Sequence, residues 1–262
     1  MFTRAIVRPP APTFAEGLTT AGLGKPDFGR AIEQHSAYCS ALEQCGLVVT
    51  RLGPDSGYPD STFVEDTAIL TEDFQQNSKR CAVITRPGAL SRQGEVTNIR
   101  TALADFYPQL FSIEAPGTLD GGDVCQAGNH FFIGLSERTN EQGAQQLASL
   151  LAPLGYSASF IDIRRIAGLL HLKSGLAYLG DNRLVVTEAL VHLALPGYER
   201  LRVVAEENYA ANCIRINDWV LVSAGYESSA GMLRELGYQT IALEMSEFQK
   251  MDGGLSCLSL RF

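Results

Sequence analysis

The sequence has no excess of positive charge. Its 21 lysine and arginine residues are outnumbered by 29 aspartate and glutamate residues, and the formal net charge is -8. A protein whose main partner is nucleic acid relies on clustered lysine and arginine side chains. The charge balance therefore argues against nucleic acid as a partner, although a local basic pocket for a carboxylate stays compatible with it.

Long hydrophobic runs are also missing. The longest apolar runs, around Leu169 and Ala189, are well short of the ~20 residues that a membrane-spanning helix needs. The first stretch, MFTRAIVRPPAP, contains arginines but lacks the apolar core of a signal peptide. We therefore expect a cytoplasmic protein with no membrane partner.

The spacing of a structural zinc site is absent as well. No CxxC or HxxxH motif occurs, and the 4 histidines lie far apart along the chain. The 6 cysteines are an even number, which in a small secreted chain indicates disulfides. In a chain of 262 residues without an export signal, free thiols in a reducing cytoplasm are the better interpretation.

What the sequence does contain is enough apolar material for a large core. Hydrophobic residues make up 45% of the chain and charged residues 19%, so disorder is not indicated. A chain of 262 residues forms one large domain or two small ones. A repeated pattern of strands and helices favours a single α/β domain over residues 1–262.

One strand-strand-helix-strand unit is visible between Gly121 and Ile163. VCQAG and NHFFIGL are typical of two strands with a turn at Gly128 between them. Apolar residues at helical spacing follow, with Thr139 and Gln142 as a capping box at the start of the helix and a glycine at its end. The strand YSASFIDI completes the unit, which is a ββαβ module.

The module recurs from residues 63, 172 and 211. A fifth copy is split: its first strand, LSCLSLRF, ends the chain, while FTRAIVRP, a helix from Phe28 to Cys45 and LVVTRL lie near the start. Repeats with a period of roughly 40 to 50 residues are typical of a ring or an array. The split copy favours an α/β ring of five modules, closed by pairing of the N- and C-terminal segments. An ordinary α/β sheet with the same rhythm is the alternative.

A ring has a consequence for chemistry, because the first strand of every module would begin at the axis. Five stretches lie at these strand starts, and they are also the stretches richest in reactive side chains: FVED, LDGGD, HLKSG, AANC and DGGLSC. Glycines there allow the backbone to approach a ligand closely. We therefore expect the functional site where these stretches meet.

Cys257, His171 and Asp120 together would supply a nucleophile, a proton carrier and an orienting acid. Each residue also has a structural interpretation, as a buried cysteine, a core histidine or a turn-forming aspartate. The stretches LDGGDVC and MDGGLSC are near copies, so the periodicity does not distinguish Cys257 from Cys125 as the nucleophile.

Four carboxylates lie near the expected axis: Asp60, Glu65, Asp66 and Asp120. Crowded carboxylates raise one another's pKa unless a cation joins them. A guanidinium is a suitable cation, because its planar N–H fork matches paired carboxylates.

Two arginines, Arg86 and Arg138, each end a second strand, in ITRPG and LSERTN. Such a pair can clamp the α-carboxylate of an amino acid, because each guanidinium offers parallel N–H donors. Ordinary surface charge is the alternative interpretation for both side chains.

Taken together, these motifs resemble the dimethylarginine dimethylaminohydrolase family, within the guanidine-modifying superfamily. The resemblance covers the chain from residue 17 almost to its end. It is carried by these stretches as a set: GLTTAGLGKPD, PDSTFVEDTAIL, ITRPGALSRQGE, APGTLDGGDV, RTNEQGA, LHLKSGLAYL, YAANCIRIN and DGGLSCLSL. The family fold is a five-bladed α/β propeller, which agrees with the five modules inferred from the periodicity.

The resemblance implies a catalytic set. Cys257 would be the nucleophile, and His171 the proton donor and later the base. Asp120 would orient the histidine and contact the substrate guanidinium. Some bacterial relatives carry glutamate in the Asp120 motif, and aspartate also occurs in the family. Cys125 would then have a structural role.

The resemblance also implies three groups of substrate-binding residues. Glu65 and Asp66 would bind the guanidinium. Asp60, with the backbone of Leu18 and Met251, would bind the α-amino group. Arg86 and Arg138 would bind the α-carboxylate.

The activity implied by the resemblance is hydrolysis of N-ω-methylated arginine to citrulline and dimethylamine or methylamine. A covalent thiouronium intermediate on Cys257 needs no organic cofactor and no metal. Zinc, a soft metal, could bind Cys257 and His171 and inhibit the enzyme. Dimers are frequent in the family, so a homodimer is compatible with the resemblance.

Two other functions stay open. The first is an arginine or agmatine deiminase of the same superfamily. Arginine deiminases carry an aspartate two residues after the catalytic histidine, where this chain has Lys173, and agmatine lacks the α-carboxylate that Arg86 and Arg138 would bind. The second is a non-catalytic arginine-binding protein, although a binder has no use for a nucleophile. The polar stretch TEDFQQNSK, residues 71–79, is expected to be a loop.

Overall fold

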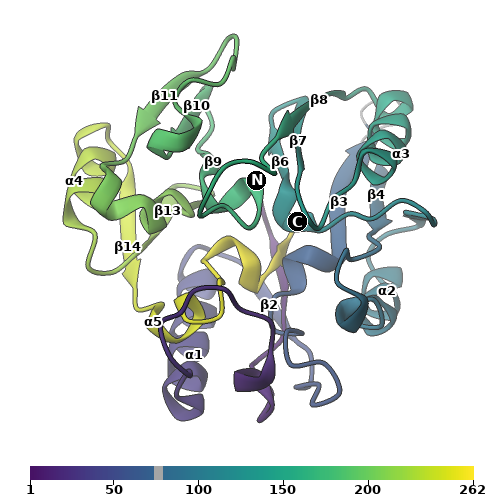
Figure 1. The fold of residues 1–262 in the computed structure, drawn as a ribbon, viewed down its shortest axis with the longest axis horizontal. Coiled ribbons are helices and arrows are strands. Elements are labelled where there is room, and N and C mark those ends of the chain that lie inside the picture. Colours follow the sequence, from purple (N-terminus) through teal and green to yellow (C-terminus); the bar gives the residue numbers. More distant parts are fainter. Residues whose placement is uncertain (74–78) are drawn as a thin grey trace. The chain divides into compact units, whose positions relative to one another are not determined.

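The computed structural model describes residues 1–73 and 79–262 of the chain. Within this part of the chain the strands form five sheets of three strands each (Figure 1). In every sheet the middle strand pairs antiparallel with one neighbour and parallel with the other. This is the strand pairing of a ββαβ module, so the five modules expected from the sequence are confirmed.

Two compact units divide the chain. One is Val64–Leu172, and the other combines Met1–Phe63 with Lys173–Phe262. A single domain over residues 1–262 stays a prediction. No helix among the described residues is long and apolar enough to cross a membrane.

The unit Val64–Leu172 contains two sheets, ordered β3-β4-β5 and β6-β7-β8. Their strands and the two α-helices of the unit are β3 (Ala68–Asp73), β4 (Lys79–Ile84), α2 (Val96–Ala104), β5 (Gln109–Ser112), β6 (Val124–Ala127), β7 (His130–Leu135), α3 (Glu141–Leu151) and β8 (Ser157–Asp162). The prediction of a loop over residues 71–79 is wrong at both ends of that stretch, because the pairing of β3 with β4 extends to Asp73 opposite Lys79. Residues 74–78 lie outside the described residues.

The core of this unit follows the periodicity of its sequence. Phe131 and Ile133 alternate along β7, and Leu147 and Leu151 recur at helical spacing along α3. All four side chains belong to one buried cluster. Burial of each such side chain stabilises the fold by about 1.5–3 kcal/mol relative to exposure.

The start of α3 differs from the expected capping box. Asn140 is the capping residue, and its side chain accepts a hydrogen bond from the Gly143 N–H at 2.8 Å. The capping box at Thr139 and Gln142 is therefore wrong. The Thr139 hydroxyl donates instead to Asp123. Gly155 ends the helical segment with a φ of 94°, a conformation that favours glycine.

The other unit contains three sheets, ordered β15-β1-β2, β11-β10-β9 and β12-β13-β14. Its strands and α-helices are β1 (Arg4–Val7), α1 (Phe28–Gln44), β2 (Val48–Arg51), β9 (Leu176–Tyr178), β10 (Arg183–Val186), β11 (Glu199–Arg202), β12 (Ile214–Ile216), β13 (Trp219–Ser223), α4 (Glu227–Glu235), β14 (Gln239–Leu243), α5 (Ser246–Gln249) and β15 (Leu260–Arg261). In the module that starts near residue 172, a 3-10 turn at Glu188–Leu190 occupies the place of the helix.

The split module is confirmed by the pairing of the two ends of the chain. β1 pairs antiparallel with β15, with Ala5 opposite Arg261, and parallel with β2. The rings of Phe14 and Phe248, whose centroids lie 5.6 Å apart, are fully buried in the core of this unit. Residues from both ends of the sequence therefore share one core.

The sequence suggested that the five stretches rich in reactive side chains are strand starts. The structure places them in turns instead. Each contributes to a short 3-10 turn: Val64–Thr67, Gly121–Asp123, Leu172–Ser174, Ala205–Ala211 and Ser256–Leu258. Turns leave backbone N–H groups without intrahelical partners, so side chains from other turns can accept from them. Glycine is needed where two turns touch: a Cβ at Gly121 would lie 2.0 Å from the Glu65 carbonyl oxygen.

Candidate active site

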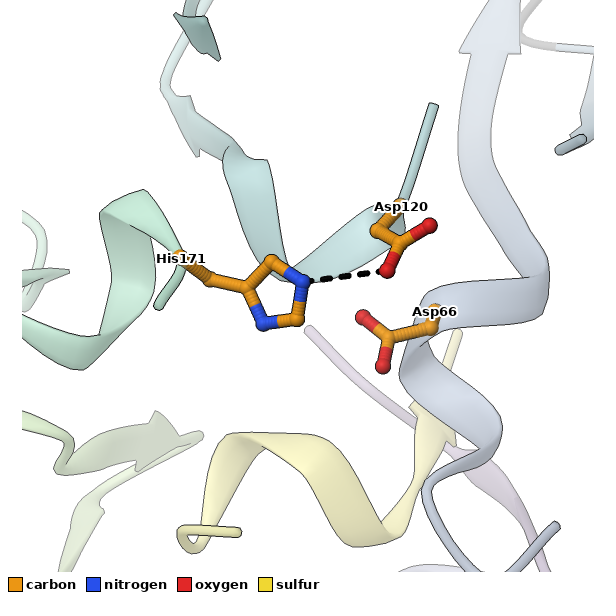
Figure 2. A group of neighbouring side chains, drawn as sticks. All are labelled: Asp66, Asp120 and His171. Carbon is orange, nitrogen blue, oxygen red and sulfur yellow. Dashed lines mark hydrogen bonds and ion pairs between the residues drawn. The ribbon is translucent and has the colours of Figure 1, made fainter. Parts of the chain in front are cut away.

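His171 and Asp120 form a buried hydrogen-bonded pair in the unit Val64–Leu172 (Figure 2). His171 immediately precedes the turn at Leu172–Ser174, and Asp120 precedes the turn at Gly121–Asp123. The distance from His171 Nε2 to Asp120 Oδ2 is 3.1 Å. The other carboxylate oxygen, Asp120 Oδ1, accepts from the Gly88 N–H at 2.9 Å. The Asp120 carboxylate is thus bound by a backbone N–H through one oxygen and by the imidazole ring through the other.

Asp66 lies beside this pair, with its carboxylate close to the imidazole ring (Figure 2). One ligand atom from each of Asp66, Asp120 and His171 lies within 4.8 Å of the others. Asp66 Oδ1 accepts from the Gly122 N–H at 2.8 Å. A Cβ at Gly122 would lie 2.8 Å from the His171 ring and 2.9 Å from Asp66 Oδ1, so only glycine fits there.

Electrostatics favour a charged histidine in this cluster. Burial lowers the pKa of His171, but Asp66, Asp123 and Asp120 outweigh it and raise the pKa to about 9. Burial also raises the pKa of Asp66, but His171 and Arg92 together lower it to about 2. At neutral pH the cluster therefore combines an imidazolium, which can give up a proton, with an ionised carboxylate.

Arg92 joins this cluster, and sequence reasoning missed it. Its Nη1 donates to Asp66 Oδ2 at 2.6 Å, while Nε and Nη2 bind the Glu95 carboxylate at 3.0 and 2.8 Å. All three side chains are buried. Burial lowers the pKa of Arg92, but Asp66 and Glu95 raise it well above its usual range. The i,i+3 spacing of arginine and glutamate in SRQGE indicates an ion pair, but the sequence does not show that this pair is buried.

Glu65, Arg86 and Arg138 lie in the same unit. Glu65 is buried next to Asp66 in the turn Val64–Thr67. Arg86 Nη1 donates to the Gly117 carbonyl at 3.2 Å. The loop that follows Arg86 packs against Arg138, since a Cβ at Gly88 would lie 2.2 Å from the Arg138 carbonyl oxygen. The structure therefore brings the two arginine loops together, and both side chains are half-buried.

Leu18, Asp60 and Met251 are brought together in the other unit. Both oxygens of Asp60 accept from the Leu18 N–H, at 3.1 and 3.2 Å. A Cβ at Gly17 would lie 2.4 Å from Asp60 Oδ1 and 3.1 Å from Met251 Cε. Asp60 and Met251 are buried, whereas Leu18 is exposed. These three residues were grouped from the motif alone.

Cys257 differs from the other cysteines in its exposure. All six cysteines are free thiols within the described residues, and Cys257 is the one that is partly exposed. Its Sγ accepts from the Gly254 N–H at 3.4 Å, a contact that favours a thiolate. Cys125 is buried, which accords with the structural role that the resemblance implies for it. Burial raises the pKa of the Cys213 thiol to about 12, so that thiol is inert.

Asn212 is a second residue that sequence reasoning missed. Its Oδ1 accepts from the Ser256 N–H at 2.9 Å, and its Nδ2 donates to the Lys173 carbonyl at 2.8 Å. A Cβ at Gly254 would lie 2.5 Å from Asn212 Oδ1. The side chain therefore fixes the turn that carries Cys257. Asn212 belongs to the AANC stretch, but no local pattern in that stretch predicts which partners its side chain binds.

The structure thus assembles two partial sets of the expected residues. Asp66, Asp120 and His171 form a cluster in one unit, with Glu65, Arg86 and Arg138 also in that unit. Leu18, Asp60 and Met251 form a second group, in the unit that also carries Cys257. The expectation that all five stretches meet at one axis stays a prediction.

Known proteins resemble the chain over its whole length. No protein-family model matches it. An N(G),N(G)-dimethylarginine dimethylaminohydrolase of Pseudomonas aeruginosa is 44% identical over 266 residues, which cover 100% of both chains. An enzyme of the same name from Streptomyces coelicolor is 34% identical and covers 98% of this chain and 96% of its own.

Solved structures agree with these relatives. A mutant of the Pseudomonas aeruginosa protein in complex with citrulline has a TM-score of 0.94 at 44% identity, with 100% of both chains covered. The N-terminal domain of ArgZ, a cyanobacterial arginine dihydrolase, has a TM-score of 0.85 at 18% identity and covers 98% of this chain and 96% of its own. The likeness to these structures, together with the five three-stranded sheets, identifies the fold as an α/β propeller of five ββαβ modules.

Proposed function

Because the chain belongs to the dimethylarginine dimethylaminohydrolase family, we propose that it hydrolyses N-ω-methylated arginine to citrulline. The substrates are asymmetric dimethylarginine and monomethylarginine, and the second product is dimethylamine or methylamine. The protein is accordingly a hydrolase of C–N bonds in linear amidines. The observation that carries the proposal is the buried cluster of His171, Asp120 and Asp66 in a chain with full-length relatives of that name.

Recognition of the substrate guanidinium falls to carboxylates in this proposal. Asp66 and Glu65 bind the guanidinium, and Asp120 contacts it while orienting His171. The lowered pKa of Asp66, caused by His171 and Arg92 against the effect of burial, keeps its carboxylate ionised. An ionised carboxylate keeps the guanidinium charged and holds its carbon in place for attack, which can lower the barrier by several kcal/mol.

Cys257 is the proposed nucleophile. Its thiolate attacks the central carbon of the methylated guanidinium, and His171 gives its proton to the leaving dimethylamine or methylamine. A covalent thiouronium remains on Cys257. His171, now neutral, takes one proton from water, whose oxygen attacks the same carbon. The bond between that carbon and Cys257 Sγ then breaks to restore the thiolate, and the remaining proton of the new hydroxyl passes to solvent as neutral citrulline leaves. The hydrogen bond from the Gly254 N–H to Cys257 Sγ supports this role, because it stabilises the thiolate.

The amino-acid end of the substrate needs acceptors for its ammonium group and donors for its carboxylate. We assign the first task to Asp60 with the backbone of Leu18 and Met251. Arg86 and Arg138 take the α-carboxylate, since a guanidinium matches a carboxylate with two parallel N–H bonds. The contact between the two arginine loops at Gly88 supports this pairing.

The experiment that tests the function is citrulline release from asymmetric dimethylarginine, monomethylarginine, arginine and agmatine in parallel. Turnover of the methylated substrates is expected. Cys257→Ser should fold and lose turnover, whereas Cys125→Ser, in the near-copy motif, should keep it. The reverse result would move the nucleophile to Cys125. His171→Gly should also be inactive.

Other outcomes of the same assay select the alternatives. Turnover of arginine or agmatine alone would make the protein a deiminase of the same superfamily. A stable arginine complex without turnover of any substrate would make it an arginine-binding protein. The reducing cytoplasm is the proposed compartment, because a thiolate nucleophile and five further free thiols suit it. Inhibition by zinc at Cys257 and His171 and formation of a homodimer stay predictions.

A further inference from the structure

We propose that Asp123 is a positioning residue, which holds the backbones of His171, Asp120 and Arg138 in register through one buried carboxylate. This inference rests on the proposed function, since it concerns residues assigned to catalysis and substrate binding there. Asp123 has no exposed surface and lies in the turn that follows Asp120. It had no role in the sequence motif beyond its place in LDGGD.

The first tie leads to His171. Asp123 Oδ1 accepts a hydrogen bond from the Leu172 N–H at 3.0 Å. Leu172 follows His171 directly and opens the turn Leu172–Ser174. Gly134 makes room for this contact, because a Cβ there would lie 2.9 Å from both Asp123 Oδ1 and Leu172 Cβ. The position of the histidine backbone therefore depends on Asp123.

The second tie leads to Asp120. The Thr139 hydroxyl donates to Asp123 Oδ2 at 2.7 Å and accepts from the Asp120 N–H at 3.1 Å. A hydroxyl has one proton to give, so its donation to Asp123 fixes the direction of both bonds. Thr139 was expected to cap a helix, and the structure uses it to connect Asp123 to the backbone of Asp120.

The third tie leads to Arg138. The Ser136 hydroxyl donates to Asp123 Oδ2 at 2.6 Å. The same oxygen, Ser136 Oγ, accepts from the Arg138 N–H at 3.0 Å. The loop that carries the proposed carboxylate-binding arginine is thereby tied to the carboxylate that also holds His171.

The hydrogen bonds fit an ionised carboxylate at this position, although burial raises the pKa of Asp123 to about 6. All three neighbours of Asp123 donate, and both hydroxyls have committed their single protons to it. A neutral amide could accept from Leu172, but Ser136 Oγ already accepts from the Arg138 and Thr139 N–H groups, so it has no lone pair left for an NH₂ donor. A buried carboxylate is costly, and three donors offset that cost. The three ties together explain why a charge is placed here.

The test compares steady-state kinetics of variants on asymmetric dimethylarginine. Thr139→Val cuts the tie to Asp120, so kcat is expected to fall by about 10- to 100-fold with little change in KM, the loss typical of a misplaced catalytic group. Ser136→Ala removes the acceptor of the Arg138 N–H and also that of the Thr139 N–H, so KM is expected to rise by about 10-fold, with a smaller fall in kcat than in Thr139→Val. Thr139→Ser keeps the hydroxyl and is expected to restore kcat. Asp123→Asn is expected to change both constants.

Thr187→Val is the matched control. Thr187 is buried, and its hydroxyl has no hydrogen-bond partner among the described residues. This variant is expected to leave kcat and KM unchanged. If Thr139→Val and Ser136→Ala lower the melting temperature but keep wild-type kcat and KM, Asp123 is a structural residue and the proposal is overturned. The same kinetic change in both variants would also overturn it.

A measurement without substrate separates this proposal from the proposed function. In protein with carbon-13-labelled histidine, the His171 ring signal is assigned by its loss in His171→Gln. Asp123→Asn is expected to broaden or split this signal and to leave those of the other histidines unchanged. An unchanged His171 signal would count against positioning. If the wild type releases no citrulline, the proposed function fails, while the ring signal still decides the role of Asp123.

Discussion

Arg92 Nη1 lies 2.6 Å from Asp66 Oδ2, and both side chains are buried. The carboxylate assigned to the substrate guanidinium is therefore already paired with a guanidinium of the protein. Nε and Nη2 of the same guanidinium bind Glu95. Burial raises the pKa of Asp66, but His171 and Arg92 together lower it to about 2, so its carboxylate is ionised. In the proposed reaction the substrate guanidinium approaches a carboxylate whose charge and direction are already set by Arg92 and His171.

Removal of Arg92 should destabilise the protein strongly. Arg92→Ala removes the guanidinium that pairs with both Asp66 and Glu95, and breaking such a buried pair costs about 3–5 kcal/mol. Urea unfolding measures the change in the free energy of unfolding. Arg51→Ala is the control, because Arg51 pairs with Glu43 at the surface and an exposed pair contributes less than about 1 kcal/mol. Equal losses of unfolding free energy in the two variants would show that the buried pairs of Arg92 stabilise the protein no more than an exposed pair does.

Stability should fall with rising pH in a window set by His171. Its pKa in the folded protein, about 9, lies above the ordinary value of 6.5 because Asp66, Asp123 and Asp120 outweigh burial. The protonated histidine therefore contributes stability that is fully present below pH 6.5 and is lost as the pH rises through about 9. The lowered pKa of Asp66, about 2, affects the free energy of unfolding only in acid, outside this window.

This pH dependence is measured by urea unfolding of the wild type and His171→Gln at several pH values from 6.5 to 9. The wild type should lose unfolding free energy relative to the variant across this window. Parallel curves would mean that His171 carries no raised pKa and is neutral in the free enzyme.

Alkylation should select Cys257 among the six thiols. Cys257 is partly exposed and accepts the Gly254 N–H, whereas the other five cysteines are buried. Iodoacetamide at neutral pH is expected to add one carbamidomethyl group to the native protein, as read by mass spectrometry, because the thiolate is the reactive form. Cys257→Ser should take up none, and Cys125→Ser should behave as the wild type. Labelling that persists in Cys257→Ser would show that another thiol is the accessible one.

Gly17→Ala should weaken substrate binding without slowing the chemical step. A Cβ at Gly17 would lie 2.4 Å from Asp60 Oδ1, so Asp60 and the Leu18 N–H must move apart. A loss of the α-amino contacts is expected to raise KM by about 10-fold with kcat nearly unchanged, as for interactions made equally in the ground and transition states. Gly53→Ala is the control, since nothing lies within 4 Å of a Cβ there. A KM that stays at the wild-type value would remove Asp60 from substrate binding.

Much of the fold could be predicted because its signals are local. The alternation of apolar residues in strands and their helical spacing in α3 depend on a few neighbouring residues, and both are confirmed. The errors have a tertiary cause. Thr139 had the sequence signature of a helix cap, but Asp123 takes its hydroxyl, and Asn140 caps the helix one residue later.

The site could be predicted only in part, for the same reason. The clustered residues Asp120, His171 and Asp66 could be singled out because their motifs carry reactive side chains. Arg92 and Asp123 were not, because their importance comes from what surrounds them. The contact of Asp66 with Gly122 spans 56 positions and that of Asp123 with Leu172 spans 49. No local pattern reports such partners or the burial that makes their charges matter.

The sequence by itself determined five ββαβ modules, a fifth module split between the two ends of the chain, and the stretches that hold reactive groups. Periodicity and motif spacing are properties of the chain alone, so they can be recognised without knowledge of the folded structure. Only the tertiary structure decided which carboxylates share a cation, which hydroxyl caps a helix and which thiol is exposed. These depend on burial and on hydrogen bonds between distant turns, and in a low-dielectric interior they decide the charge state of each group.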